Sequence, residues 1–164
     1  MSRPPLRLKH YFFTKINCEA DLNYKDPHPK AGNKYEVKVR SNVAPRKDKD
    51  RDWMAILDIH VFSPEKPAPY KLDLQVTGFF EVLPDYPENK VKELIRITGA
   101  SLLYSGAREY VLGFTSRGPW GPVLLPTISF IETKQQEEPQ SKKSRKPRDA
   151  STSKGSEIDK TRLI

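Results

Sequence analysis

The stretch from Gly99 to Phe130 constrains the fold of this chain more than any other, because it joins two segments with different physical properties. Four apolar residues in its first half recur at the spacing of one helix face: Leu103, Ala107, Val111 and Phe114. Ser105 is a candidate N-cap, and Arg117 followed by Gly118 is a typical helix stop, since glycine readily adopts a left-handed conformation. The sequence therefore predicts an amphipathic helix that ends near Gly118.

The second half of the stretch is apolar but cannot be helical. Pro119, Pro122 and Pro126 each lack an amide donor and have a fixed φ. Large apolar side chains lie between and after these prolines: Trp120, Val123, Leu124, Leu125, Ile128 and Phe130. An extended, proline-stiffened apolar segment must either lie on another surface or have a partner lie on it.

These residues resemble the signature of the SecB family of export chaperones. The family's motifs occur here in order: Leu103-Tyr104-Ser105-Gly106-Ala107-Arg108-Glu109, Ser116-Arg117-Gly118, and Leu124-Leu125-Pro126 followed by Phe130. In that family an aromatic-x-x-Ala-Arg-Glu helix runs into a Ser-Arg-Gly turn and then into a crossover loop. The resemblance is weaker upstream, but it follows the same order.

Upstream of this stretch, the chain alternates between apolar and polar residues in four segments that predict strands: Leu6–Cys18, Lys34–Ala44, Trp53–Phe62 and Tyr70–Val82. Short turns favour an antiparallel meander, and Gly78 is expected to form a bulge that re-phases the two faces of its strand. Residues 88–98 predict a first helical piece, and Gly99 and Gly106 are expected to bend or break the helix. The predicted fold class is α+β: a SecB-like four-stranded antiparallel sheet followed by a long helix in two pieces.

The composition changes sharply after Phe130. Residues 133–164 contain nine Lys and Arg against five Asp and Glu, so they carry half of the net charge of +8. Such a segment buries too little apolar area to offset its ordering entropy. We expect a SecB-like domain over residues 1–132 and a disordered basic tail over 133–164. The basic cluster Lys142–Arg148 leaves open a second functional class, a nucleic-acid-associated protein that binds phosphates through its tail.

The sequence contains no pattern typical of an enzyme. A single cysteine, Cys18, excludes an intramolecular disulfide, and His10, His28 and His60 lack the spacing of metal ligands. There is no glycine-rich phosphate loop and no nucleophile elbow. Asp58 and His60 share one strand face, where an exposed charged surface is favoured over a catalytic pair. We therefore expect no enzyme, cofactor or metal site. Since no apolar run is long enough for a membrane span or a signal peptide, we expect a cytoplasmic protein.

With no catalytic or metal site expected, apolar surface is the feature that points to a function. A chain of this size cannot cover every apolar face that its strands and crossover segment present. Self-association and a groove for an extended apolar peptide both remain open. The resemblance implies both: a homotetramer, built as a dimer of dimers, that acts as an ATP-independent holdase. Such a chaperone binds unfolded precursor proteins and supports their export by passing them to the SecA translocase motor.

The resemblance also assigns residues to these roles. Candidate client-binding residues come from the crossover segment and from aromatic pairs in the strands: Phe12, Phe13, Phe79, Phe80, Trp120, Val123, Leu124, Leu125 and Phe130. The candidate oligomer helix presents the apolar stripe described above: Leu103, Ala107, Val111 and Phe114. Glu19 matches one acidic position of the motor-docking surface, but Ile16 and Asn17 lie where another acid is expected. The family's final amphipathic helix is replaced by a polar segment. A SecB-like chaperone dedicated to the antitoxin of a toxin–antitoxin system is therefore the alternative to an export chaperone.

Overall fold

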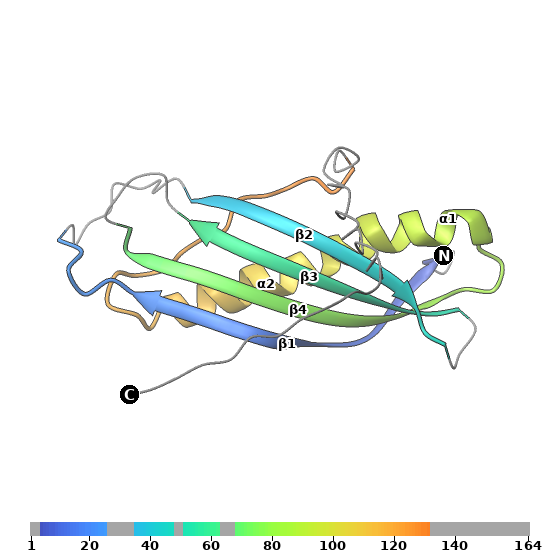
Figure 1. Ribbon diagram of the computed structural model, residues 1–164, viewed down its shortest axis with the longest axis horizontal. Helices are drawn as coiled ribbons and strands as arrows, with labels where there is room; N and C mark the ends of the chain where they lie inside the picture. Colours follow the sequence, from blue (N-terminus) through green and yellow to red (C-terminus); the bar gives the residue numbers. More distant parts are fainter. Residues whose placement is uncertain (1–3, 26–34, 48–50, 63–67, 132–164) are drawn as a thin grey trace, which may run out of the picture.

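The computed structural model describes residues 4–25, 35–47, 51–62 and 68–131. Seven elements follow one another in this part: β1 (Leu6–Ala20), β2 (Glu36–Pro45), β3 (Asp52–Phe62), β4 (Tyr70–Val82), α1 (Glu88–Leu94), the π-helical turn η1 (Ile95–Gly99) and α2 (Ala100–Thr115). The strands form one layer, and the helical region covers one face of it (Figure 1). The predicted α+β class, with a four-stranded antiparallel sheet followed by a long helix, is confirmed.

The strand order is β1-β4-β3-β2, with every neighbouring pair antiparallel. The predicted meander therefore holds for β2, β3 and β4, but it is wrong for β1, which pairs with β4 instead of β2. Fifteen residues, 21–35, separate β1 from β2 in the sequence, so the connection is too long to force the two strands to pair. As a result, β1 and β2 form opposite edges of the sheet (Figure 1).

Gly78 does not re-phase β4, contrary to the expectation from sequence. The register with β3 runs without interruption through Ala55 opposite Gly78, and the irregularities lie in β1, between Leu8 and His10 and again after Phe13. Gly78 faces the helices, and a Cβ there would lie 2.5 Å from the Leu103 side chain. The glycine therefore allows α2 to approach the sheet closely.

The core lies between the sheet and the helical region. Its largest fully buried side chains come from β3, β4 and the helices: Leu57, Ile59, Leu72, Phe80, Ile95, Leu103 and Val111. Alternate residues of the two central strands point into this core, as the period of two predicts. The opposite face of the sheet is not covered by any element of the described part (Figure 1).

The helical region continues from α1 through η1 into α2 without a break in the chain's helical path. The π-helical turn ends at Gly99, where a Cβ would lie 3.2 Å from the ring of Phe80. The predicted interruption at Gly106 is wrong, and so is the predicted N-cap at Ser105, because both residues lie inside α2. Gly106 instead gives room to the ring of Tyr11, which would contact a Cβ at 3.0 Å.

One end of the sheet is held by charged side chains. Lys9, at the first irregularity of β1, donates from Nζ to both carboxylate oxygens of Asp52, at 2.8 and 3.0 Å. Asp52 is buried, so this ion pair is shielded from water. Arg51 has a φ of 68° and donates from Nη1 to the carbonyl oxygen of Tyr86, at 2.9 Å. These contacts attach the β2–β3 connection to β1 and to the segment that precedes α1.

Candidate functional site

Residues 119–131 form the crossover segment, which leaves the C-terminal end of α2 and runs back past β2 (Figure 1). Trp120 anchors its beginning. The indole Nε1 donates to the carbonyl oxygen of Asp21 at 2.9 Å, and the Trp120 amide donates to the hydroxyl of Tyr70 at 3.1 Å. The ring of Tyr24 packs edge-on against the indole, with centroids 5.4 Å apart. Trp120 therefore joins the crossover segment to the ends of β1 and β4.

Gly118 is required by Tyr70 and not by its own backbone conformation. The sequence suggested a left-handed glycine at this position, but among the described glycines only Gly121 has a positive φ, of 75°. A Cβ on Gly118 would lie 2.3 Å from the Tyr70 hydroxyl oxygen. Tyr70 is buried, and its hydroxyl also donates to the carbonyl oxygen of Thr115 at 3.4 Å. The Ser-Arg-Gly turn thus leaves space for the tyrosine that orients Trp120.

Three side chains of α2 hold the middle of the crossover segment through its backbone. The Thr115 hydroxyl accepts from the amide of Val123 at 2.8 Å and donates to the carbonyl oxygen of Val111 at 2.7 Å. Arg108 Nε donates to the carbonyl oxygen of Leu125 at 3.0 Å, and the Tyr104 hydroxyl donates to that of Pro126 at 2.8 Å. Two of these side chains donate to carbonyl oxygens of the segment and one accepts from its amide, so α2 satisfies backbone groups of the segment directly.

These hydrogen bonds accompany a strict alternation of burial. Val123 is 3% exposed and Leu125 is fully buried, whereas Leu124 between them is 64% exposed. Phe130 is buried and meets Tyr104 edge-on, with ring centroids 6.0 Å apart. Leu124 is therefore the large apolar side chain that the held part of the crossover segment presents to solvent.

The environment of two buried groups changes their acid–base behaviour. Burial raises the pKa of Tyr104 above its ordinary value of 10.0, and the positive charge of Arg108 partly opposes this rise. The phenol therefore keeps its proton, which it needs in order to donate to Pro126. Burial also raises the pKa of the Cys18 thiol, which lies on the helix side of β1.

A second apolar surface lies between β1 and α2. The rings of Phe13 and Tyr110 are 4.5 Å apart, and Tyr110 stacks on Phe114 at 6.2 Å. Tyr11 meets Phe13 edge-on at 6.4 Å, and Ile16 continues the row along the strand. Tyr11, Ile16 and Phe114 are each more than 40% exposed, so this row, the β1–α2 aromatic row, is open to solvent along its length.

Two other predicted aromatic residues, Phe12 and Phe79, lie on the outer face of the sheet, away from α2. Phe79 stacks on His10 at 4.8 Å and lies 6.0 Å from Phe12, with the guanidinium of Arg46 over its other side at 5.1 Å. Neighbouring residues of a strand point to opposite faces, so Phe12 and Phe13 belong to different surfaces. Phe80 is fully buried in the core and cannot contact a client.

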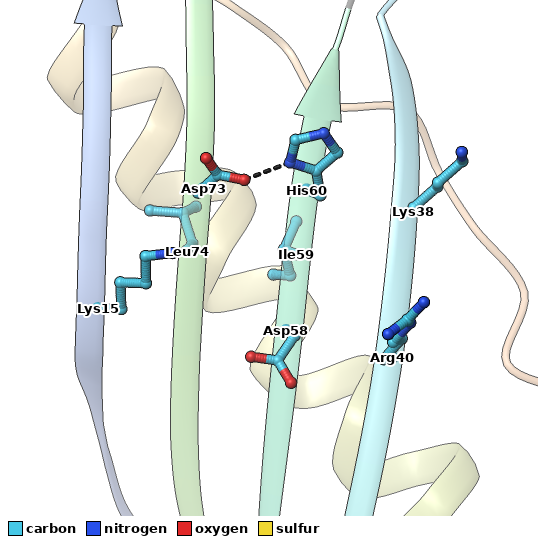
Figure 2. A pocket seen from close by; sticks show the side chains of 8 residues that line it. All are labelled: Lys15, Lys38, Arg40, Asp58, Ile59, His60, Asp73 and Leu74. Carbon is cyan, nitrogen blue, oxygen red and sulfur yellow. Dashed lines mark hydrogen bonds and ion pairs between the residues drawn. The ribbon is translucent and has the colours of Figure 1, made fainter. Parts of the chain in front are cut away.

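The outer face also carries the charged group that Figure 2 shows. His60 Nδ1 pairs with Asp73 across β3 and β4, and Asp58 accepts from Gln75 Nε2 at 2.8 Å. The basic side chains of Lys15, Lys38 and Arg40 line the same shallow pocket. Asp58 and His60 share this face, as the sequence predicted, but each pairs with a residue of β4. The pocket presents a charged surface with both signs.

Of the thirteen residues predicted for client binding and for the oligomer helix, seven are buried inside the protomer: Phe80, Leu103, Ala107, Val111, Val123, Leu125 and Phe130. Trp120, Phe13 and Phe79 are half-buried, and Phe12, Phe114 and Leu124 are exposed. Sequence reasoning gave no role to Tyr70 or Thr115, and it named Tyr104 and Arg108 only as members of the family motif. The spacing of Tyr104 and Arg108, one helical turn apart and before a proline-rich segment, was the available signal.

The described part lacks two other kinds of feature. It holds no group of three or more His, Cys, Asp or Glu residues placed to bind a metal ion. None of the helices within it combines the length and the apolar character that crossing a membrane requires.

Comparisons with known proteins agree with this architecture. A SecB-like chaperone of Mycobacterium tuberculosis, solved in complex with a ChAD peptide from the HigA1 antitoxin, is 16% identical, with a TM-score of 0.60. That similarity covers 76% of this chain and 91% of the other. A protein of unknown function from Streptococcus agalactiae is 11% identical over 74% of this chain and 97% of its own, with a TM-score of 0.43 that is too low to support an argument. No curated protein matches the sequence.

A family profile described as "Preprotein translocase subunit SecB" matches residues 8–141. This range includes β1 from its third residue onward, β2, β3, β4, the whole helical region and the crossover segment. The chain therefore belongs to the SecB family.

Proposed function

We propose that this protein is an ATP-independent holdase chaperone that binds unfolded client chains through apolar surface. The observation that carries the proposal is Leu124, which is 64% exposed on a segment whose backbone buried side chains hold in place. An apolar side chain that is already fixed in solvent requires little further ordering when it binds a client. The β1–α2 aromatic row supplies further apolar area of the kind that binds peptides without a fixed sequence.

Assembly into a homotetramer, a dimer of dimers, is part of the proposal. Phe114 is 46% exposed, and Leu102 and Leu112 are also exposed on α2. The other members of the predicted oligomer stripe pack against their own sheet. A helix that carries exposed apolar residues on faces away from its own sheet is well suited to bury them against a second copy. We propose a cytoplasmic location for this assembly.

Two classes of client fit the holdase. The family description, a preprotein translocase subunit, favours precursor proteins as clients. We propose that these clients are passed to the SecA translocase motor, with Glu19 as the docking residue. Glu19 is exposed on the outer face opposite Lys71, so its surroundings are not uniformly acidic. The Mycobacterium tuberculosis chaperone with its bound antitoxin peptide favours the second class, a dedicated antitoxin client. A client peptide in an extended conformation suits both.

The test is the refolding of a slow-folding precursor, diluted from denaturant with and without this protein at known native mass. Refolding is expected to stall at about one tetramer per client. Leu124→Ser should release the client, whereas Leu22→Ser, which changes a still more exposed leucine in the β1–β2 connection, should not. If an excess of the tetramer leaves refolding unchanged, general holdase function is wrong, and binding of antitoxin-derived peptides becomes the next measurement.

The proposed domain division and the nucleic-acid alternative depend on residues 133–164, which lie outside the described residues. Deletion of this tail tests both. Client holding should survive the deletion, because the surfaces that carry the proposal lie before residue 132. Loss of client holding would contradict the division. Binding of DNA by the full chain that disappears with the tail would support the alternative class.

A further inference from the structure

Two neighbouring leucines of the crossover segment have opposite environments, although their side chains are identical. Leu124 is 64% exposed and Leu125 is fully buried. In an extended segment, a slip by one residue exchanges the two faces, so sequence alone does not select which leucine reaches solvent. Something outside the segment must fix its register.

The contacts that fix the register come from α2. Tyr104 and Arg108 lie one helical turn apart and donate to successive carbonyl oxygens, those of Pro126 and Leu125. A slip that moved Pro122 to the place of Val123 would leave the Thr115 hydroxyl without its amide donor, and the donors of Tyr104 and Arg108 hold the segment's backbone in its observed place. Tyr104 is buried and Arg108 is half-buried, so a hydrogen bond lost here is poorly replaced by water. Arg108 also donates from a charged group, which strengthens its hydrogen bond.

We propose that Tyr104 and Arg108 are positioning residues that hold Leu124 outward for client binding. The inference rests on the proposed holdase function and assigns these two side chains a role through Leu124, without contact to the client. Without the two donors, the segment would sample other registers, and the client would have to select the competent one. The apparent client affinity would then equal the intrinsic affinity multiplied by the fraction of molecules in the competent register.

The experiment is a double-mutant cycle with a permanently unfolded probe, reduced and carboxymethylated α-lactalbumin carrying a fluorescent label. Its affinity is measured for the full chain, Arg108→Met, Leu124→Ala and the combined variant. Methionine keeps the packing of the arginine stem and removes every N–H donor. Arg108→Met is expected to weaken binding roughly 10- to 150-fold, as for the loss of one charged hydrogen bond. It should have almost no further effect in the Leu124→Ala background.

Two further measurements separate positioning from general instability. Hydrogen exchange should become faster in residues 119–131 of Arg108→Met and remain unchanged in β3 and β4. Arg117→Met is the matched control, because Arg117, two residues after the end of α2, also donates to a backbone carbonyl oxygen, but to that of Gly113 inside α2. It should bind the probe as the unchanged chain does.

The possible outcomes are distinguishable. If Leu124→Ala weakens binding but Arg108→Met does not, the positioning role is wrong and the holdase function stands. Additive effects of the two changes would also overturn the inference, since Arg108 would then act independently of Leu124. If the unchanged chain does not bind the probe at all, the proposed function itself fails. Non-additive weakening with local exchange supports the proposal.

Discussion

Gly118→Ala should destabilise the fold more than its small size suggests. The added Cβ would lie 2.3 Å from the Tyr70 hydroxyl oxygen, whereas ordinary van der Waals contact begins at 3.4 Å. Tyr70 is 3% exposed and cannot move into solvent without disturbing the core. Its displacement would break the hydrogen bond from the amide of Trp120 and the one to the carbonyl oxygen of Thr115.

The cost can be estimated from these contacts. Overpacking in a filled site costs about 1–3 kcal/mol. The two hydrogen bonds contribute roughly 0.5–1.5 kcal/mol each. We therefore expect Gly118→Ala to lower the free energy of unfolding by about 2–6 kcal/mol, a large part of the ~5–15 kcal/mol that is typical of a domain. The measurement is urea denaturation followed by circular dichroism at one fixed protein concentration, because association would otherwise shift the midpoint.

The same substitution at Gly113 is the matched control. Gly113 lies in α2, and a Cβ there would meet no heavy atom within 4 Å. Gly113→Ala should raise the free energy of unfolding by ~0.5–1 kcal/mol through helix propensity. Tyr70→Phe, which removes the hydroxyl, should relieve part of the effect of Gly118→Ala. A Gly118→Ala protein as stable as the unchanged chain, or a double variant that loses the full sum of both costs, would refute this steric account.

Two further predictions concern charge and pH. Lys9→Ala removes the ammonium group that pairs with the buried carboxylate of Asp52, and it should lower the free energy of unfolding by about 3 kcal/mol. Arg7→Ala, which breaks an exposed ion pair, should lower it by less than ~1 kcal/mol. Equal losses for the two variants in urea denaturation would contradict this interpretation. The second concerns Tyr104, whose pKa is raised above 10.0 in the fold, so its protonated form is favoured there. Its contribution should be complete below pH 10 and decrease as the pH rises further, because the unfolded chain loses the proton first. The stability difference between the unchanged chain and Tyr104→Phe, measured at about pH 8 and about pH 11, should therefore shrink; a difference that stays constant would count against the buried hydrogen bond.

The candidate site could be located from the sequence only in part. The crossover segment was identified because prolines and apolar residues alternate in it, and Leu124 is exposed as a client-binding residue requires. Phe12 and Phe13, however, were assigned to one role although neighbouring strand residues point to opposite faces. The structure places Phe12 on the outer face and Phe13 in the β1–α2 aromatic row. Period-two alternation was a usable signal for this separation.

The sequence by itself determined four strands, a helix with one buried face, and a non-helical apolar segment after Gly118, because all of these follow from local periodicity. These features depend on neighbours close in the chain, so spacing is enough to predict them. Only the tertiary structure decided that β1 pairs with β4, that Gly118 makes room for Tyr70, and that Leu124 and not Leu125 faces solvent. Each of these depends on contacts between residues far apart in sequence, whose geometry is fixed only when the sheet, the helix and the crossover segment pack together.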